Sequence, residues 1–166
     1  MKLSQFDPNK ETTAFFKILH PVTNEPLIDE NGEQVGFETY SDNSKKANAS
    51  KTLMHSNVLQ RKQEYIAELG RPVTTEESST EEVKALHQWD KDNAQKIETK
   101  VKEFVNEEFV LHLGRCCGEV KGSIELDSGE IATSAADVLK ENEWILSQLF
   151  TFRTDMSNWV PKQPDN

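Results

Sequence analysis

The densest apolar pattern in the chain lies near its C-terminus, in the stretch 131–160. Five apolar residues recur there at alternating spacings of four and three, namely Ile145, Leu149, Phe152, Met156 and Trp159. This spacing places them on one face of a helix, with polar residues on the opposite face. We expect the inner positions of this face, Ile145, Leu149 and Met156, to contribute to the core.

The residues that flank and interrupt this stretch predict two helices. Thr133 or Ser134 suits an N-cap, because a side-chain hydroxyl accepts a hydrogen bond from a main-chain N–H of the first turn. Asn142 interrupts the apolar pattern between the two segments. The sequence therefore predicts helices over 134–142 and 144–158.

Two longer helices are predicted in the middle of the chain. Ser41 or Asp42 is a candidate N-cap for a helix over 43–69, whose apolar residues lie on one side among many Lys, Asn and Gln residues. A second helix is predicted over 81–115, with acidic residues in its first turn that suit the helix dipole. The polar stretch 70–80 between them reads as a linker.

Strand signals are concentrated in the first quarter of the sequence. Residues 14–20 are rich in aromatic and branched side chains, and residues 35–40 alternate as a strand does. Asn31-Gly32 between them is a tight-turn signal. The segment 119–131 is open between a short strand and an irregular loop. The fold class we expect is α+β, predominantly α-helical, with a small N-terminal antiparallel β unit packed on a helical bundle.

The expected organisation is one compact domain with short ends. Its segments are a flexible arm (1–13), a β-hairpin with a long helix (14–69), the polar linker (70–80), a helical C-terminal part (81–160) and a tail (161–166).

Charge and composition argue against nucleic-acid-binding, membrane and secreted proteins. The formal net charge is −10 and the acidic residues are spread along the chain, which argues against nucleic acid or an anionic membrane surface as the main partner. No apolar run approaches the ~20 residues of a membrane span, and the N-terminus has no signal-peptide pattern. The adjacent Cys116 and Cys117 favour free thiols in a reducing compartment, because a disulfide between neighbours is strained. We expect a cytosolic protein.

Motifs for catalysis, cofactors or metals are missing from the sequence. The seven glycines form no phosphate-binding loop. His112 and Cys116 lie at i and i+4 with Cys117 adjacent, but no second Cys or His pair accompanies them, so buried thiols near a helix end are the favoured reading. We expect no cofactor, no metal and no enzymatic activity.

Large apolar side chains near the end of the chain indicate partner binding as the remaining candidate function. Large aromatics at the two ends of a terminal helix are typical of interface anchors as well as of cores. The edge of the last helical stretch carries four such side chains, and we name these as candidate partner-binding residues: Trp144, Phe150, Phe152 and Trp159.

Two stretches resemble one protein family. The segment 15–62 contains a strand, the turn His20-Pro21-Val22-Thr23-Asn24-Glu25-Pro26, a second strand and a basic, Gln-containing helix. Later come a helix over 104–114, a Gly/Asp loop and the ending Asp155-Met156-Ser157-Asn158-Trp159. Together these features resemble the tail assembly chaperones of long-tailed, siphovirus-type bacteriophages. Asn24 stands where glycine is common, and asparagine also accepts the left-handed conformation.

The resemblance implies a function that no motif encodes. Such chaperones are not enzymes; they coat the tape measure protein, a long helical protein, and keep it soluble until tail tube subunits polymerise around it. The family often makes a longer form by a programmed ribosomal frameshift, which would add a C-terminal extension able to meet the tail tube protein. The resemblance also implies a location in the host cytoplasm and absence from the mature virion. Self-association stays open.

The resemblance also suggests where the tape measure protein binds. We expect the helix 144–159, together with the helix 97–113, to form or border that site. The competing hypotheses are a structural virion protein of the tail tube or terminator type, and a small enzyme. Structural tail proteins of that type are mostly β-sandwiches, whereas strand signals here are few.

Overall fold

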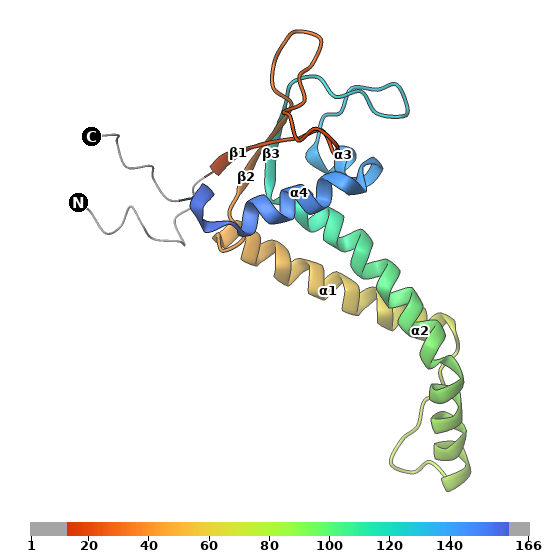
Figure 1. Ribbon diagram of the computed structural model, residues 1–166. Helices are drawn as coiled ribbons and strands as arrows, with labels where there is room; N and C mark the ends of the chain where they lie inside the picture. Colours follow the sequence, from red (N-terminus) through yellow and green to blue (C-terminus); the bar gives the residue numbers. More distant parts are fainter. Residues whose placement is uncertain (1–12, 160–166) are drawn as a thin grey trace, which may run out of the picture. The chain divides into compact units, whose positions relative to one another are not determined.

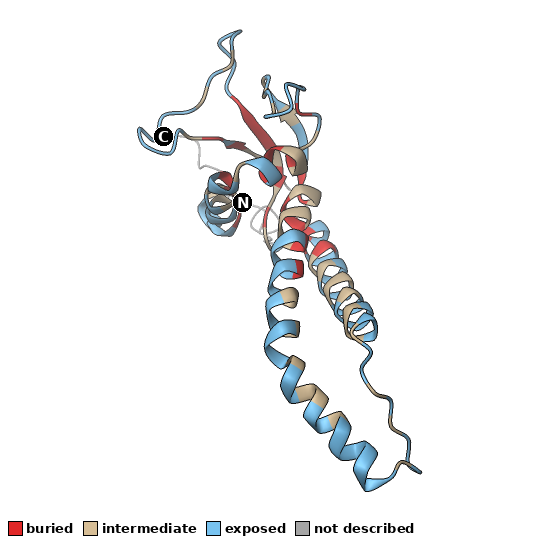
Figure 2. Ribbon diagram, turned by 90° about the vertical axis from the view of Figure 1, so that its right-hand side faces the viewer, coloured by how far each residue is buried: buried red, intermediate tan, exposed pale blue. Residues whose placement is uncertain are grey.

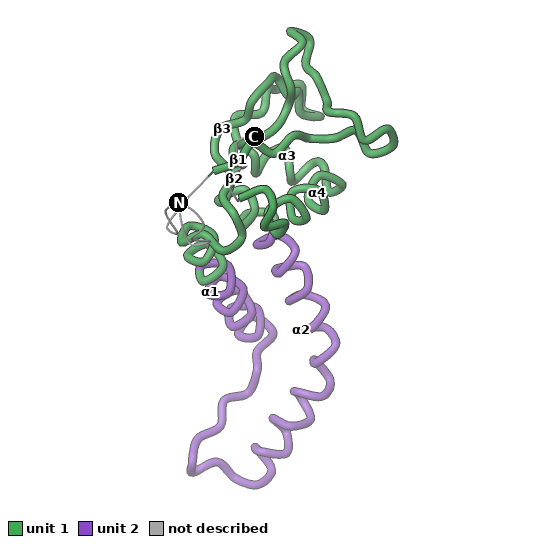
Figure 3. Tube along the Cα trace, turned by 60° about the vertical axis from the view of Figure 1, so that its left-hand side comes forward, with its two compact units in different colours: residues 1–52, 110–166 green, residues 53–109 purple. Residues whose placement is uncertain are grey.

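A computed structural model describes residues 13–159 of the chain (Figure 1). These residues form two compact units (Figure 3). The first unit contains the described residues 13–52 and 110–159, and the second is Leu53–Phe109. The helices α1 (Lys45–Glu68) and α2 (Thr80–Arg115) each run from one unit into the other, and the linker expected at 70–80 lies inside the second unit. The expected tail and all but the last residue of the expected arm lie outside the described residues.

A three-stranded antiparallel sheet forms part of the first unit. Its strands are β1 (Thr13–Lys17), β2 (Gly36–Tyr40) and β3 (Cys117–Lys121), in the order β1-β2-β3. The sheet and the helices confirm the expected α+β, mostly helical fold class. The segment 119–131, which the sequence left open between a short strand and an irregular loop, begins with the end of β3, whose first residue lies two positions before this segment. The pairing of β3 with β2 is a long-range contact, which the short sequence Cys117–Lys121 does not signal.

The connection between β1 and β2 contains the His-Pro turn. The His20 N–H donates to Glu25 O at 2.8 Å, and the Asn24 N–H donates to His20 O at 2.9 Å. Asn24 has φ 57°, which is the left-handed conformation predicted for this position. The His20 Nδ1 accepts from the main-chain N–H groups of Val22 and Thr23. His20 therefore serves the turn itself.

Two short helices pack in the first unit, α3 (Ala135–Glu141) and α4 (Glu143–Thr154), followed by the 3-10 turn η2 (Met156–Asn158). Ser134 caps α3 as predicted, since its side chain accepts from the Asp137 N–H. Ile145 and Leu149 are buried, which confirms that part of the predicted core face. The placement of Met156 in the core is wrong, because α4 ends at Thr154 and the change to a 3-10 turn leaves Met156 41% exposed.

The start of α1 also differs from the prediction. The helix begins at Lys45, and the cap is Ser44, whose Oγ accepts from the Ala47 N–H at 3.1 Å. Ser41 and Asp42 precede this cap in a turn, where Ser41 O accepts from the Ser44 N–H. Several polar residues in a row each fit an N-cap, so sequence alone does not distinguish them.

The second unit is a pair of antiparallel helical segments. Contacts between them include the edge-to-face rings of Tyr65 and Phe104, with centroids 6.3 Å apart, and an ion pair between Arg61 and Glu107 at 2.7 Å. In this unit only Phe104 and Glu108 are buried among the described residues. Figure 2 shows the long helices mostly in the colours of exposed and intermediate residues. Most of the buried core thus belongs to the first unit, around the sheet, α3 and α4.

Candidate partner-binding groove

A groove of about 600 Å³ lies between β1 and α4 in the first unit. Its lining mixes apolar rings and aliphatic groups with uncharged polar side chains, and it includes Phe15, Phe16, Leu19, Gln148, Thr151 and Phe152. Lys17 and Asp155 are the two charged residues that line it. We call this feature the β1–α4 groove. Its composition suits a partner segment that carries apolar side chains.

The helical repeat of α4 explains which residues reach the groove. Ile145, Leu149 and Arg153 recur every four residues and are buried. Gln148 and Thr151 lie on the neighbouring face, which therefore borders the sheet edge. The Gln148 side-chain amide accepts from the Leu19 N–H at 3.1 Å and donates to Leu19 O at 3.0 Å, so it fixes α4 beside β1.

Aromatic rings make up the floor of the groove. The buried Phe16 stacks on Phe37, with centroids 6.1 Å apart, and lies 5.4 Å from the Phe152 ring. Trp159 meets Phe152 edge to face at 5.8 Å. Phe152 is therefore held between Phe16 and Trp159 while it still lines the groove. Rigid rings of this kind lose little conformational entropy when a partner binds.

The four candidate residues fall in different places. Phe152 and Trp159 lie together at the groove, as described. Trp144 is 37% exposed and lies one helical turn before Gln148, so it continues the groove-facing side of α4. Phe150 is 45% exposed and lies on another face of α4, away from the residues that line the groove.

The other wall of the groove comes from residues that sequence reasoning did not select. Phe15 and Leu19 belong to β1 and its extension, and Gln148 was not among the candidates. The helical segment 97–113, expected as the second wall, supplies none of the described residues that line this groove. The aromatic and branched residues of 14–20 predicted a strand, but no sequence signal placed that strand at the edge of the sheet beside α4.

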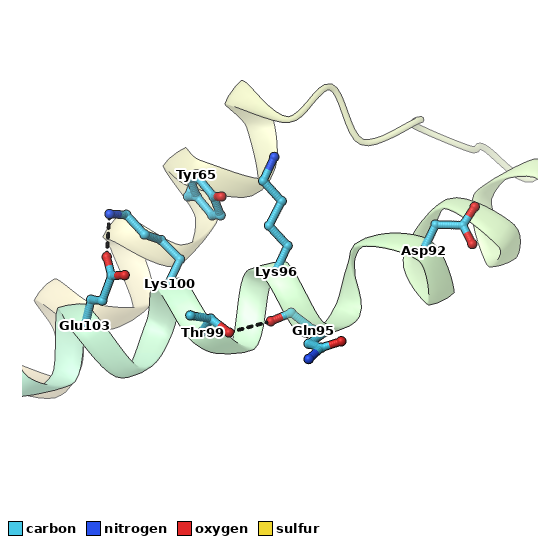
Figure 4. A pocket seen from close by; sticks show the side chains of 7 residues that line it. All are labelled: Tyr65, Asp92, Gln95, Lys96, Thr99, Lys100 and Glu103. Atoms are coloured by element: carbon cyan, nitrogen blue, oxygen red, sulfur yellow. Dashed lines mark hydrogen bonds and ion pairs between the residues drawn. The ribbon is translucent and has the colours of Figure 1, made fainter.

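A second depression lies in the second unit and is polar. Figure 4 shows the residues that line it, which include Tyr65, Lys96, Lys100 and Glu103. Lys100 pairs with Glu103 at 2.6 Å, and the Thr99 hydroxyl donates to Gln95 O at 3.0 Å. These are contacts within one helix, typical of a solvated helix surface. We therefore place the candidate site at the β1–α4 groove.

Buried polar groups gather behind the groove. Arg153 is 1% exposed; its Nε donates to Tyr40 O at 2.9 Å, and an Nη lies 3.7 Å from an Asp42 oxygen. His112 is also buried, with its Nδ1 2.9 Å from Ser50 Oγ. These contacts join α4, the end of β2 and the two long helices within the first unit. They stabilise the groove from inside and do not face it.

The two thiols are expected to be unreactive in the folded protein. Cys116 and Cys117 are free and buried, and burial raises the pKa of both thiols, that of Cys117 to about 11. Because the thiolate is the reactive form, a disulfide reagent at pH 8 should modify neither residue in the native chain and both in denaturant. Rapid modification of the native protein would contradict their burial.

His112 is expected to make stability depend on pH. Burial lowers the pKa of His112 from the ordinary 6.5 to about 4, and the positive charge of Arg153 is the second cause. Asp42 raises this pKa, whereas Lys51 and Arg115 lower it further. The folded state therefore favours neutral imidazole, and its stabilising effect is complete above pH 6.5. As pH falls from 6.5 to 5, the free energy of unfolding should drop by roughly 1 kcal/mol per pH unit.

Chemical denaturation at a series of pH values measures this effect. His112→Gln keeps a side-chain amide that can donate to or accept from Ser50 and has no proton to gain, so its stability should stay nearly constant between pH 6.5 and 5. The same slope in wild type and variant would assign the effect to other groups.

Two further observations concern metals and membranes. Within residues 13–159, no three His, Cys, Asp or Glu side chains come together in a metal-binding arrangement. The helices of the same part of the chain are too short or too polar to cross a bilayer.

No protein-family model matches the chain, and no curated protein or solved structure is significantly similar to it.

Proposed function

We propose that this protein is a tail assembly chaperone of a long-tailed bacteriophage. In this role it binds the tape measure protein, keeps it soluble and promotes polymerisation of the tail tube around it. The sequence features that resemble this family, the His20–Pro26 turn and the aromatic ending at Trp159, suggest the function. It acts in the host cytoplasm and does not remain in the mature virion.

The observation that carries this proposal is the β1–α4 groove. It offers the apolar rings of Phe15 and Phe152 next to uncharged polar groups, which suits binding of an apolar segment. The exposed Trp144 extends the same side of α4. A holding chaperone needs such a surface, because contacts that hide apolar groups of a client keep the client from aggregating.

The acidity of the chain supports the same role. A net charge of −10 keeps a protein soluble at high concentration and discourages it from associating with itself. A chaperone that coats a long client in many copies benefits from both properties. A tail tube partner, reached through a frameshifted extension, belongs to the same proposal.

A structural tail protein is the alternative, and the analysis of purified virions distinguishes the two. By mass spectrometry, the tail tube and tape measure proteins should be abundant in virions, whereas this chain should be absent. Its detection in stoichiometric amounts would contradict the chaperone proposal and favour a tail tube or terminator role.

A further inference from the structure

β1 is an edge strand whose outer side faces the β1–α4 groove. The Ile18 N–H donates to Val35 O at 3.0 Å, and the register pairs Phe16 with Phe37. In an antiparallel pair the hydrogen-bonding side alternates along the strand. The main-chain groups of Phe16 and Ile18 therefore point toward β2, and those of Phe15 and Lys17 point away from it.

Within residues 13–159, the outer side of β1 is paired at one end and unpaired along the rest. Gln148 satisfies both main-chain groups of Leu19, as a residue of a neighbouring strand would. No residue among 13–159 pairs with the outward groups of Phe15 and Lys17, which both line the groove. The open edge therefore lies within the groove and ends at Gln148.

We propose that the groove binds a segment of the partner in an extended conformation, added as a fourth strand to the outer edge of β1. Main-chain groups two residues apart, at Phe15 and Lys17, match the ~7 Å repeat of an extended strand. A helix bonds its own main-chain groups internally and leaves none for this edge. The floor made by Phe152 receives alternate side chains of the added strand.

The occupant is an extended segment of the tape measure protein, and this inference rests on the proposed function. Its chemistry is apolar at alternate positions, with an acidic residue near Lys17, for which no described residue supplies an ion pair. A second copy of the chain fits less well. A five-residue strand is short beside the ~20–30 residues per side of a stable interface between two folded copies.

Proline at position 17 tests this geometry. Lys17→Pro removes the outward N–H and leaves the bonds from β1 to β2 intact, because edge strands accept proline where the N–H faces outward. Lys17→Gln is the matched control, since it removes the charge and keeps the N–H. On co-expression with the tape measure protein, we expect Lys17→Pro to co-purify at least tenfold less of it. Lys17→Gln should lose no more than about threefold, which is the share that an exposed ion pair of Lys17 contributes. Equal recovery by all three chains would overturn the inference.

Amide hydrogen exchange by NMR gives a readout that does not depend on a variant. In the free chain, the amides of Phe16 and Ile18 should be protected and those of Phe15 and Lys17 should exchange fast. In the purified complex with the tape measure protein, Phe15 and Lys17 should also become protected.

The other outcomes separate the hypotheses. A complex that leaves Phe15 and Lys17 unprotected overturns strand addition and leaves the chaperone function standing. Protection that appears in the chain alone and rises with its concentration assigns the edge to a second copy. If the tape measure protein does not bind at all, the proposed function is wrong and the inference is wrong with it.

Discussion

Gly36→Ala is expected to abolish stable folding of the first unit. An alanine Cβ at this position would lie 2.0 Å from the main-chain oxygen of Phe16 and 3.0 Å from the Phe15 ring. The first contact involves main chain, so it is relieved only if β1 moves away from β2. This movement would separate β1 from β2 and expose the buried Phe16. We therefore expect the free energy of unfolding to fall by more than about 4 kcal/mol.

Thermal or urea unfolding, followed by circular dichroism, measures this loss. Gly32→Ala is a suitable control, because Gly32 lies in a turn with φ 80° and an added Cβ meets nothing within 4 Å. The control should cost only about 1 kcal/mol, the price of a left-handed alanine. Unfolding of Gly36→Ala at the same denaturant concentration as Gly32→Ala would contradict the close approach of β1 and β2.

Phe152→Asp is expected to remove tape measure binding. The ring of Phe152 lines the groove and contacts Phe16 and Trp159, so the substitution replaces an apolar contact with a carboxylate. Burial of a partner's apolar side chain against that carboxylate is unfavourable by several kcal/mol, or roughly a hundredfold or more in affinity. Pull-down of the tape measure protein from co-expressing cells measures the effect.

Phe150→Asp is the matched control for this substitution. It makes the same chemical change on the same helix, but Phe150 is 45% exposed and does not line the groove. Its recovery of tape measure protein should stay within about threefold of wild type, a difference of less than 1 kcal/mol. Phe152→Leu removes the ring contacts with Phe16 and Trp159 but keeps an apolar side chain in the groove. If it binds the tape measure protein while Phe152→Asp does not, the carboxylate and not the lost ring contacts explains the loss of binding. Similar losses in Phe150→Asp and Phe152→Asp would contradict the assignment of the site to the groove.

Long helices and local turns were predictable from the sequence. The helix predicted over 81–115 is observed at Thr80–Arg115, because its apolar spacing and acidic first turn are local signals. The left-handed Asn24 and the Ser134 cap follow from local chemistry in the same way. The sequence left a short strand open at 119–131, but its pairing with β2 was not predictable, since that pairing joins residues about eighty positions apart in the chain.

The sequence predicted the side of the groove that the last helical stretch forms, but not the side that β1 forms. The stripe on the last helical stretch indicated Phe152 and Trp159, which the structure brings together. It did not indicate that α4 ends at Thr154. The helical spacing therefore does not extend to Met156, and its predicted place on the buried face was wrong. The other wall, Phe15 and Leu19, joins the site through Gln148 across 129 positions of sequence, and no periodicity encodes such a contact.

Co-expression with the tape measure protein tests the central claim most directly. Three cultures are compared: the tape measure protein alone, with the wild-type chain, and with the chain carrying Phe152→Asp and Trp159→Ala. We predict that the tape measure protein is insoluble alone, soluble and co-purified with wild type, and again insoluble with the double variant. If the folded double variant still keeps the tape measure protein soluble and co-purifies with it, the groove is not the binding site.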